Sequence, residues 1–585
     1  MRTLNNSFSN IIPLINAWLR RRCAPAQMTI MILSLSAGGL TLFTPGPSAI
    51  AAPALPQGFE PGQIERQVDG VPSAPRVSRT APLPDAAKTL VSMQEQSFVL
   101  AGVLIEDATV FSNIDFLPLY QPLLGKKMTV AGLRKIAEAI TQRYHSAGYF
   151  LSYAFLPAQH IEFGVVRIRV SEGYISNWRM LDGAPIRDPL LDKMLRPVIG
   201  QRPLRRDTLD AVFQKLAALE DMVAHPDVRP LADQLGAYEL VISSERKRFE
   251  GSASIDNHGS DYIGPVQGVL TLRAFDLTGH HESYQLKLAT AAQPSELHYF
   301  DFSTEWLLGA SGLRMQAGAA HTSADPGGIL KSQDAHIEND RVRLGVTYPL
   351  RHAANASSYL GATINAYHSR TDLLGIKRLE DRLTSVMLSY RHIYQNDDVA
   401  THAMGISLSN GLKVAGSEVR DTQSATGIGR ADFSKLGFNY NYQRVLSRCC
   451  ELSAQFDGQY AANALPASER YSIGGAQFGR AYDPSEISGD HGLAGRLELA
   501  QRHVDSKPRW RVRPYGFYDI GAVWQRFPLT ATGRDSLASF GLGIRSASAS
   551  FSTYIEAVKP LTRAVAAQGN DGRTPRVFAG VSYRF

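Results

Sequence analysis

Residues 478–492 read FGRAYDPSEISGDHG and lie between two segments in which apolar and polar residues alternate. Alternation with a period of two is typical of a β-strand that has one apolar and one polar face. Further along the chain, the strand-like segment 511–524 carries Asp519 on its polar face. Because Arg480 lies in the loop and Asp519 on a strand, the pattern predicts a loop that is held inside a β-barrel by an ion pair.

The whole region from residue 249 to residue 585 repeats this alternation. It contains 16 strand-length segments, and an even number is typical of bacterial outer-membrane barrels. The last six segments are 451–460, 493–502, 511–524, 537–546, 551–560 and 576–585. Aromatic residues near the segment ends favour a membrane barrel over a soluble β-sandwich. We therefore predict a 16-stranded antiparallel transmembrane β-barrel over 249–585, with an inward loop at 462–492.

The N-terminal region has the features of an export signal followed by a linker. Three arginines at 20–22 precede a mostly apolar stretch, and residues 49–51 fit the A-x-A cleavage pattern. We expect a signal peptide at 1–51 and a Pro-rich linker at 52–96, in which residues 63–68 could form a short plug helix. No apolar run of about 18 residues, the length of a membrane-spanning helix, follows the signal.

Two small α+β modules are predicted between the linker and the barrel, over 97–175 and 176–248. In the first module, apolar residues recur at helical spacing from Leu133 to Tyr144, after Thr129 as a capping residue. Strand-like segments surround this helix at 98–105, 149–156 and 165–170. The second module repeats the plan, with strand-like or helical segments at 178–181, 190–195, 209–216 and 238–242.

The end of the first module contains two characteristic runs of residues. Residues 148–159 read GYFLSYAFLPAQ, and residues 166–173 read VRIRVSEG. This order resembles the signature of POTRA domains in two-partner-secretion transporters, the TpsB group of ShlB, FhaC and HecB type. The signature positions are Gly148, Tyr149, Leu156, Pro157 and Gln159. Most of these residues are also expected to pack the small domain.

The resemblance implies a transporter in the outer membrane of a Gram-negative bacterium, with two POTRA domains in the periplasm. Such modules receive one large unfolded exoprotein of the TpsA type, which crosses the barrel without ATP by two-partner (type V) secretion. An exposed strand edge of a module could accept the extended client by strand addition. The other implied partners are outer-membrane lipid and the barrel-assembly machinery, with Phe585 as the C-terminal barrel signal. The chain is expected to act as a monomer.

The same resemblance assigns roles around the loop. In the family, a Val-Arg-Gly-Tyr loop tip contacts a Phe-x-Asp-x-Gly strand, and the tip maps here to residues 479–482. The implied residues are Arg480 and Asp519 as the lock, Phe478, Gly479, Ala481, Tyr482, Gly489, Asp490 and Gly492 in the loop, and Phe517 and Gly521 on the strand. Because Ala481 stands where the family has glycine, and Gly479 where it has valine, the tip is expected to have less backbone freedom after Arg480. Gly521 is expected to leave room for the loop.

Three further charged residues, Arg496, Glu498 and Glu556, are expected to face the lumen as a solvated wall. No catalytic or cofactor motif is recognisable: Gly309-Ala310-Ser311-Gly312 lacks the spacing of a nucleophile elbow, and the histidines have no ligand-spaced partners. The adjacent Cys449 and Cys450 cannot easily bridge. We therefore expect no enzymatic activity, no cofactor and no metal.

The net charge of +7 is spread along the chain, so nucleic acid is not an expected partner. The main alternative function is an outer-membrane protein assembly or insertion factor of the barrel-assembly type, which typically has more POTRA repeats. A passive porin would need neither modules nor an inward arginine loop. A barrel-anchored hydrolase would need the catalytic motif that the sequence lacks.

Overall fold

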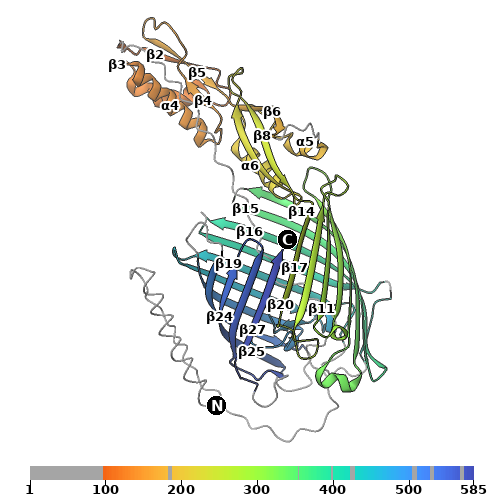
Figure 1. The fold of residues 1–585 in the computed structure, drawn as a ribbon. Helices are drawn as coiled ribbons and strands as arrows, with labels where there is room; N and C mark the ends of the chain where they lie inside the picture. The colour runs from red at the N-terminus through yellow and green to blue at the C-terminus, as the bar shows by residue number, and fades with distance from the viewer. Residues whose placement is uncertain are drawn as a thin grey trace, which may run out of the picture.

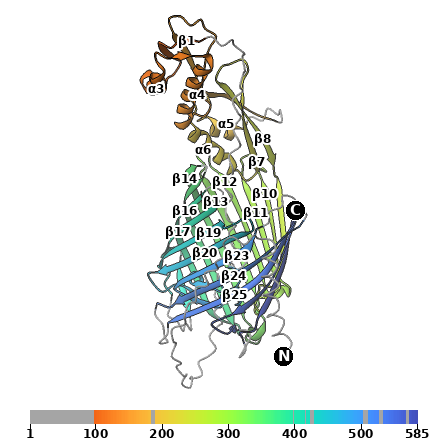
Figure 2. The same ribbon diagram turned by 90° about the vertical axis from the view of Figure 1, so that its left-hand side faces the viewer.

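The computed structural model describes residues 97–585 except for eight short gaps. These gaps are 182–187, 354, 397–398, 415, 422–428, 503–509, 527–532 and 567–571. The signal peptide, the linker and the short plug helix predicted at 1–96 therefore lie outside the described residues. In the described part, two small modules are stacked at one mouth of a tilted barrel (Figure 1). A view turned by a right angle shows the same stacking (Figure 2).

The first module is a three-stranded sheet with helices packed on it. Its elements are β1 (Phe98–Val99), β2 (Gly102–Glu106), α3 (Asn113–Tyr120), η2 (Gln121–Leu123), β3 (Lys127–Met128), α4 (Val130–Ser146), β4 (Tyr153–Phe155) and β5 (Val165–Ser171). The sheet order is β2-β5-β4, with β2 parallel and β4 antiparallel to β5. The sequence did not predict α3, and the predicted strand 149–156 is shortened to β4.

Helix α4 forms because its apolar residues share one face, and that face is buried against the sheet. The Thr129 side chain accepts a hydrogen bond from the Gly132 amide, which caps the helix as predicted. Beyond the helix, Gly148 has a φ of 91°, a left-handed conformation that favours glycine. The Gln159 side chain both donates to and accepts from the backbone of Arg167, at 2.7 Å each, and so pairs with β5 beyond the end of β4.

The second module repeats the topology of the first. Its elements are β6 (Tyr174–Met180), α5 (Pro189–Leu195), α6 (Arg206–Ala217), β7 (Met222–Pro230) and β8 (Ala237–Arg246). In the sheet order β6-β8-β7, β6 is again parallel and β7 antiparallel to the central strand β8. The sequence did not predict β7, which contains two prolines and lies at an edge of the sheet, where proline is tolerated.

The region that follows is a closed antiparallel barrel of 16 strands, which confirms the predicted fold class. In chain order its strands are β9 (Phe249–Asp256), β10 (Gln267–Phe275), β11 (Ser283–Ala291), β12 (His298–Leu307), β13 (Arg314–Ala324), β14 (His336–Ala353), β15 (Ala356–Leu373), β16 (Ile376–Asn396), β17 (Ala400–Leu412) with its extension β18 (Glu418–Asp421), β19 (Ser434–Val445), β20 (Cys450–Ala461), β23 (His491–Gln501), β24 (Arg511–Trp524), β25 (Arg534–Ala547), β26 (Phe551–Pro560) and β27 (Arg576–Arg584). The barrel closes where β27 pairs with β9.

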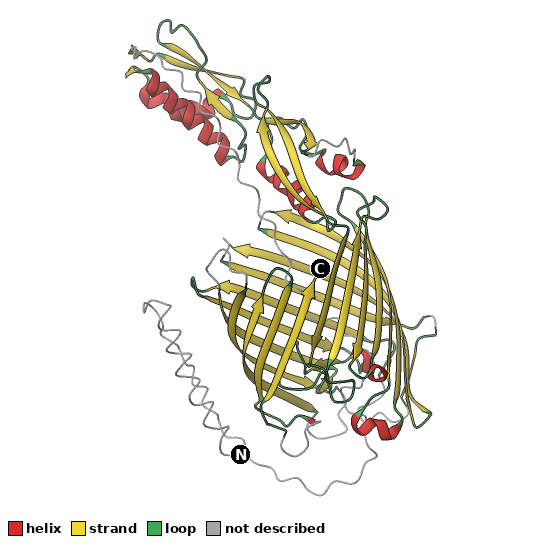
Figure 3. Ribbon diagram, in the orientation of Figure 1, coloured by secondary structure: helices red, strands yellow, loops and turns green. Residues whose placement is uncertain are grey.

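Alternation along the strands separates an apolar exterior from a polar interior. On β24, Tyr518 and Ile520 are exposed on the outside, whereas Asp519 between them is fully buried inside. Helices occur in the modules and as short turns at the opposite end of the barrel (Figure 3). No helix within the described ranges has the length and apolarity needed to cross a membrane.

The second module contacts the barrel through two turns at the near mouth. Beside the turn between β12 and β13, Leu307 and Ala310 pack against the core of the module. The turn between β10 and β11 contributes His281, whose side chain is only 3% exposed. Its Nε2 lies 2.8 Å from an oxygen of Asp188, and its Nδ1 lies 2.9 Å from an oxygen of Asp221. Both carboxylates belong to the module, so one imidazole joins the module to the barrel.

This arrangement fixes the charge of His281. Burial by itself lowers the pKa of the imidazole, but the hydrogen bonds to Asp188 and Asp221 outweigh burial and raise the pKa to about 10. Arg246 pairs with Asp188 and with Asp276, at 3.8 and 3.2 Å, so the acidic groups around His281 are partly neutralised. The imidazole is therefore a cation that donates from both ring nitrogens.

We predict that the junction between module and barrel is held throughout the neutral range and loosens near pH 10. A folded-state pKa above the ordinary value of 6.5 gives stability that is complete below 6.5 and is lost as the pH rises through about 10. The substitution His281→Gln should weaken the junction by about 3 kcal/mol at pH 7, because it removes the buried cation that Asp188 and Asp221 share. Distances between spin labels on module and barrel measure the effect.

The matched control is His280→Gln, because His280 is the exposed neighbour in the same turn. This variant should keep the wild-type distance distribution at pH 7 and the same alkaline transition. If His281→Gln shows that transition unchanged, His281 does not hold the junction.

Candidate functional site in the barrel lumen

The loop between β20 and β23 is folded into the barrel. It contains the turn η5 (Ala467–Glu469) and a short hairpin made of β21 (Tyr471–Ile473) and β22 (Ile487–Gly489). Apolar side chains of the hairpin pack against inward-facing residues of the wall. The buried cluster comprises Tyr471, Ile473, Phe478, Ala481, Tyr482 and Ile487 of the loop, with Ala494, Ala500, Tyr515, Phe517, Val523, Leu537, Val558, Val565 and Phe578. This packing keeps the loop inside the lumen.

The tip of the loop is a tight turn. The amide of Tyr482 donates to the carbonyl of Gly479 at 2.9 Å, which places Arg480 and Ala481 at the two central positions. Gly479 has a φ of 80°, and a Cβ atom there would lie 2.7 Å from Leu537. Neither Arg480 nor Ala481 has a positive φ, so the alanine fits the turn without strain. In this turn the residue with left-handed backbone geometry, Gly479, precedes the arginine, whereas the resemblance had suggested backbone freedom after it.

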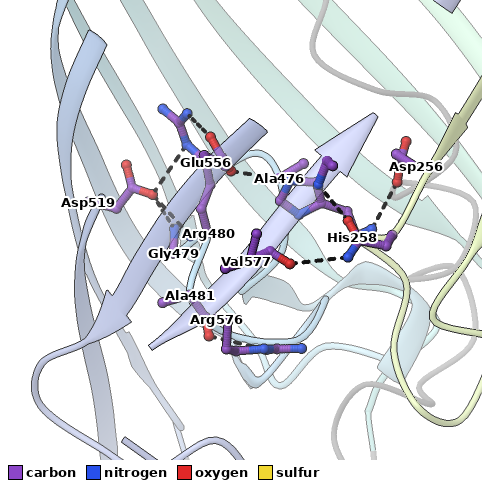
Figure 4. Close-up of polar contacts among 12 residues, drawn as sticks. Asp256, His258, Ala476, Gly479, Arg480, Ala481, Asp519, Glu556, Arg576 and Val577 are labelled. Carbon is purple, nitrogen blue, oxygen red and sulfur yellow. Dashed lines mark hydrogen bonds and ion pairs between the residues drawn. The ribbon is translucent and has the colours of Figure 1, made fainter. Parts of the chain in front are cut away.

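Asp519 holds the loop mainly through the loop's backbone (Figure 4). Its Oδ2 accepts hydrogen bonds from the amides of Gly479 and Arg480, each at 3.0 Å. The guanidinium that pairs closely with Asp519 belongs to Arg496, with Nε 2.8 Å and Nη2 3.3 Å from the two carboxylate oxygens. Arg480 Nε lies 3.8 Å from Asp519, beyond hydrogen-bond distance. The structure thus brings the Arg480 and Asp519 side chains within 3.8 Å, but without a hydrogen bond between them.

The Arg480 guanidinium binds two other carboxylates. Its Nη2 donates to Glu498 on β23 at 2.9 Å, and its Nη1 donates to Glu556 on β26 at 3.1 Å. Its Cζ lies 3.5 Å from the centre of the Phe517 ring, a cation–π contact. Arg480 is 4% exposed, so these contacts replace almost all of its hydration.

Six charged side chains form the cluster, and their charges balance. Arg545 on β25 completes the set by binding the same oxygen of Glu498 as Arg480 does, at 3.0 Å. The three cations and three carboxylates are Arg480, Arg496, Arg545, Asp519, Glu498 and Glu556. Arg496, Glu498 and Glu556 are buried, so the expectation of a solvated wall was wrong for them. The signal in the sequence that could have identified these three residues as part of the cluster is their inward-facing position on strands near the loop.

The remaining residues predicted for the loop brace its base. Asp490 accepts from the amide of Leu465 on one oxygen and from the amide of Arg526 on the other, each at 2.8 Å. The hydroxyl of Tyr482 donates to the carbonyl of Ala538 at 3.0 Å. Arg576 on β27 binds the Asp483 carboxylate at 2.6 Å and the Ala481 carbonyl at 3.1 Å. Hydrogen bonds therefore hold the loop at its base through Asp490, at its tip through Tyr482, and against β27 through Asp483.

Three glycines let the loop lie close to the wall. A Cβ atom would lie 2.5 Å from Ile473 at Gly521, 2.9 Å from the backbone oxygen of Trp524 at Gly489, and only 1.8 Å from the Tyr471 ring at Gly492. Residue types with a side chain at these positions would push the hairpin away from the wall.

The cluster has the chemistry of a structural lock. All its polar groups are charged partners of one another, and none is a nucleophile beside a base. Elsewhere in the described chain, Asp221, Asp276 and His281 have ligand atoms within 4.8 Å of one another, as a metal site requires. Both nitrogens of His281 already face carboxylates there, and Asp276 binds Arg246, so the three residues take part in an ion-pair network.

A closed barrel with two α+β modules at one mouth and a charge-pinned loop inside defines a class: transmembrane β-barrels with a plug loop. Residues 239–546 match the family described as haemolysin secretion/activation protein ShlB/FhaC/HecB. Residues 98–173 match the POTRA domain of ShlB type. The chain therefore belongs to the ShlB/FhaC/HecB family of haemolysin secretion/activation proteins, as the resemblance had suggested.

Similar proteins with curated descriptions agree with this family. The hemolysin transporter protein HpmB of Proteus mirabilis is 24% identical over 75% of this chain and 78% of its own length. The outer membrane transporter CdiB of Escherichia coli O6:K15:H31 is 23% identical over 72% and 73%. The heme/hemopexin transporter protein HuxB of Haemophilus influenzae strain 86-028NP is 20% identical over 73% and 76%.

Solved structures show the same fold. CdiB from Escherichia coli superposes with a TM-score of 0.68 at 19% identity, and covers 92% of this chain and 100% of its own. CdiB from Acinetobacter baumannii gives 0.58 at 16% identity, over 89% and 95%. BamA from Haemophilus ducreyi lacking POTRA domains 1–3 gives 0.50 at 15% identity, over 83% and 100%. At these identities the likeness concerns the fold alone.

We predict that Gly492→Ala unseats the loop without unfolding the barrel. The added methyl would overlap the Tyr471 ring, so the hairpin must leave the wall and the lumen should conduct ions more often. Conductance in planar lipid bilayers measures this, with an expected rise in open-channel time of about tenfold, which corresponds to about 1.4 kcal/mol. Gly268→Ala is the matched control, because a Cβ atom there meets nothing closer than 3.9 Å. Equal conductance in the two variants would contradict the prediction.

Proposed function

We propose that this protein is an outer-membrane transporter that receives an unfolded exoprotein on its periplasmic modules and passes it through the barrel by two-partner secretion. The observation that carries the proposal is the buried charge cluster that seats a removable loop in a lumen with modules at its mouth. A passive pore needs no such loop, and the family's members are transporters rather than enzymes.

The partner is a large secreted protein of the TpsA type. We propose that the units 97–175 and 176–248 are the two receiving modules, and that the client adds to one of their free sheet edges. The edge strand β7 contains Pro226 and Pro230, which lack amide donors and so blunt this edge. The edges β2 and β4 of the first module and the edge β6 of the second contain no proline. These edges are the better candidates for strand addition.

Translocation requires the loop to move. The plug is held by polar contacts as well as by packing, and a buried ion pair contributes little net stability because desolvation offsets the attraction. A polar, extended client can therefore compete for the same wall charges as it enters. Progressive folding of the client outside supplies the free energy, because a folded client cannot slide back. No ATP is then needed.

The apolar exterior of the barrel suits outer-membrane lipid. We propose that the chain works as a monomer in that membrane, inserted by the barrel-assembly machinery, with the modules in the periplasm.

The first test removes the guanidinium at the loop tip. Arg480→Ala should lower secretion of the exoprotein at least about tenfold, because it leaves Glu498 and Glu556 with one partner fewer and mis-seats the tip. The barrel should still assemble, since Asp519 keeps its contact with Arg496. Exoprotein in the medium is measured against folded barrel, identified by its heat-modifiable migration on gels.

Arg420→Ala is the control, since Arg420 is an exposed arginine that pairs with Glu418. Its secretion should match the wild type. Unchanged secretion by Arg480→Ala in a folded barrel would remove the loop tip from the mechanism.

The second test concerns the receiving module. Deletion of residues 97–175 should abolish secretion and leave the conductance of the pore, because the first module has its own core and lies away from the lumen. Secretion and single-channel conductance are measured on the same variant. Normal export would show that this module is not the receptor.

A further inference from the structure

The seam of the barrel, where the first strand β9 pairs with the last strand β27, is shorter than the neighbouring strand pairings. Strand β9 pairs with β27 at five register positions, 252–256 with 580–584, and backbone hydrogen bonds between Gly251 and Phe585 and from Asn257 to Ala579 continue the ladder at its two ends. The neighbouring ladders, β9 with β10 and β26 with β27, each extend over eight. The hydrogen bonds of a short ladder are the easiest to lose, so this seam is the natural place for the barrel wall to loosen.

Side chains just after β9 extend the seam beyond its backbone ladder. Asn257 donates from its side-chain nitrogen to the carbonyl of Val577 at 3.1 Å, and its side-chain oxygen accepts from the amide of Ala579 at 2.7 Å. The side-chain amide of Asn257 thus makes the two hydrogen bonds that a paired strand residue would make, and it holds the end of β9 against β27. The backbone amide of the next residue, His258, donates a hydrogen bond to the Asp256 carboxylate at 2.9 Å (Figure 4).

His258 reaches across the seam to the loop cluster. Its imidazole stacks on the Phe578 ring of β27, with 4.2 Å between ring centres and 12° between planes. Its Nε2 lies 3.2 Å from Oε1 of Glu556 on β26. The side chain is 12% exposed, so water does not separate the two groups. One histidine just after the first strand thus contacts both of the last two strands.

Glu556 is shared between the seam and the loop. Its Oε2 accepts from Arg480 at 3.1 Å and from the Tyr515 hydroxyl at 2.7 Å, whereas Oε1 faces His258. The carboxylate is rigid because it is 3% exposed and held from several sides. When the loop tip leaves, Glu556 loses Arg480 and is free to turn. When the seam opens, Glu556 loses His258.

We propose that His258 is a positioning residue that couples closure of the β9–β27 seam to seating of the loop tip, through the Glu556 carboxylate that it shares with Arg480. The proposal rests on the proposed role of the loop in transport. Because the coupling is a free energy between two sites, it is reciprocal: a seated loop stabilises the closed seam, and a closed seam stabilises the seated loop. Passage of a client that displaces the loop would therefore also loosen the barrel wall.

The experiment measures the seam directly. Ser254 and Ser582 are register partners across the seam and line the same lumen cavity, so Ser254→Cys with Ser582→Cys reports closure by disulfide formation. Cys449 and Cys450 are replaced by serine in the full-length protein. The rate of cross-linking by a mild oxidant is then compared for the wild-type site, Arg480→Ala, His258→Phe and the double variant.

Arg480→Ala should slow cross-linking on the order of fivefold where His258 is present, the low end of measured couplings between sites. It should have no further effect in the His258→Phe protein. Phenylalanine keeps the ring that stacks on Phe578 but lacks Nε2, so it separates the contact with Glu556 from simple packing. An equal effect of Arg480→Ala in both proteins, or no effect in either, overturns the coupling.

Conductance gives the reciprocal measurement. Cross-linking the seam should lower the open-channel time by the same factor when His258 is present. It should leave the open-channel time unchanged in His258→Phe. An open-channel time that cross-linking does not change when His258 is present also overturns the proposal. Folded barrel is verified by heat-modifiable migration. Neither readout uses the exoprotein, so failure of the coupling leaves the secretion test of Arg480→Ala intact, and the reverse also holds.

Discussion

A guanidinium that is almost completely removed from water must find its charge partners in the protein, and Arg480 finds them on two strands of the barrel wall. This requirement ties the tip of a loop to β23 and β26, while the backbone around the arginine is tied to Asp519 on β24. The position of the loop in the lumen follows from this requirement. The glycines that face the hairpin, the tight turn at residues 479–482 and the apolar cluster all serve to bring that one group to its partners.

Charge balance explains why the plug can be both well positioned and displaceable. Three cations and three carboxylates share one small volume. Arg480 lies within ion-pair distance of all three carboxylates, and Glu498 and Asp519 each have a second arginine, so the loss of Arg480 leaves those two paired. The net free energy of such a network is small, because the attraction is offset by lost hydration. Its geometry is nevertheless specific, since guanidinium and carboxylate groups bond in fixed directions. The proposed transport would need this combination, because the plug would have to return to the same place after each client.

The same device occurs at the other end of the lumen. At the junction between the second module and the barrel, the His281 imidazole lies between two module carboxylates. A client that moves from the modules to the lumen would pass from one buried ion-pair network to another. In both places a cation from one structural unit holds carboxylates of another, so the parts of the protein are joined by contacts that have direction but little net strength.

The sequence alone determined the fold, because strand alternation and helical spacing are local patterns that the chain repeats many times. Strands β24 and β26 have the predicted bounds, and α4 begins after the predicted cap Thr129. It also named Arg480 and Asp519, which the resemblance placed together. Only the tertiary structure decided which charges meet: Arg496 takes Asp519, Arg480 takes Glu498 and Glu556, and His258 reaches Glu556 from the opposite end of the barrel sequence. Such contacts depend on strand register and barrel closure, which bring together residues of different strands and leave no local pattern in the sequence.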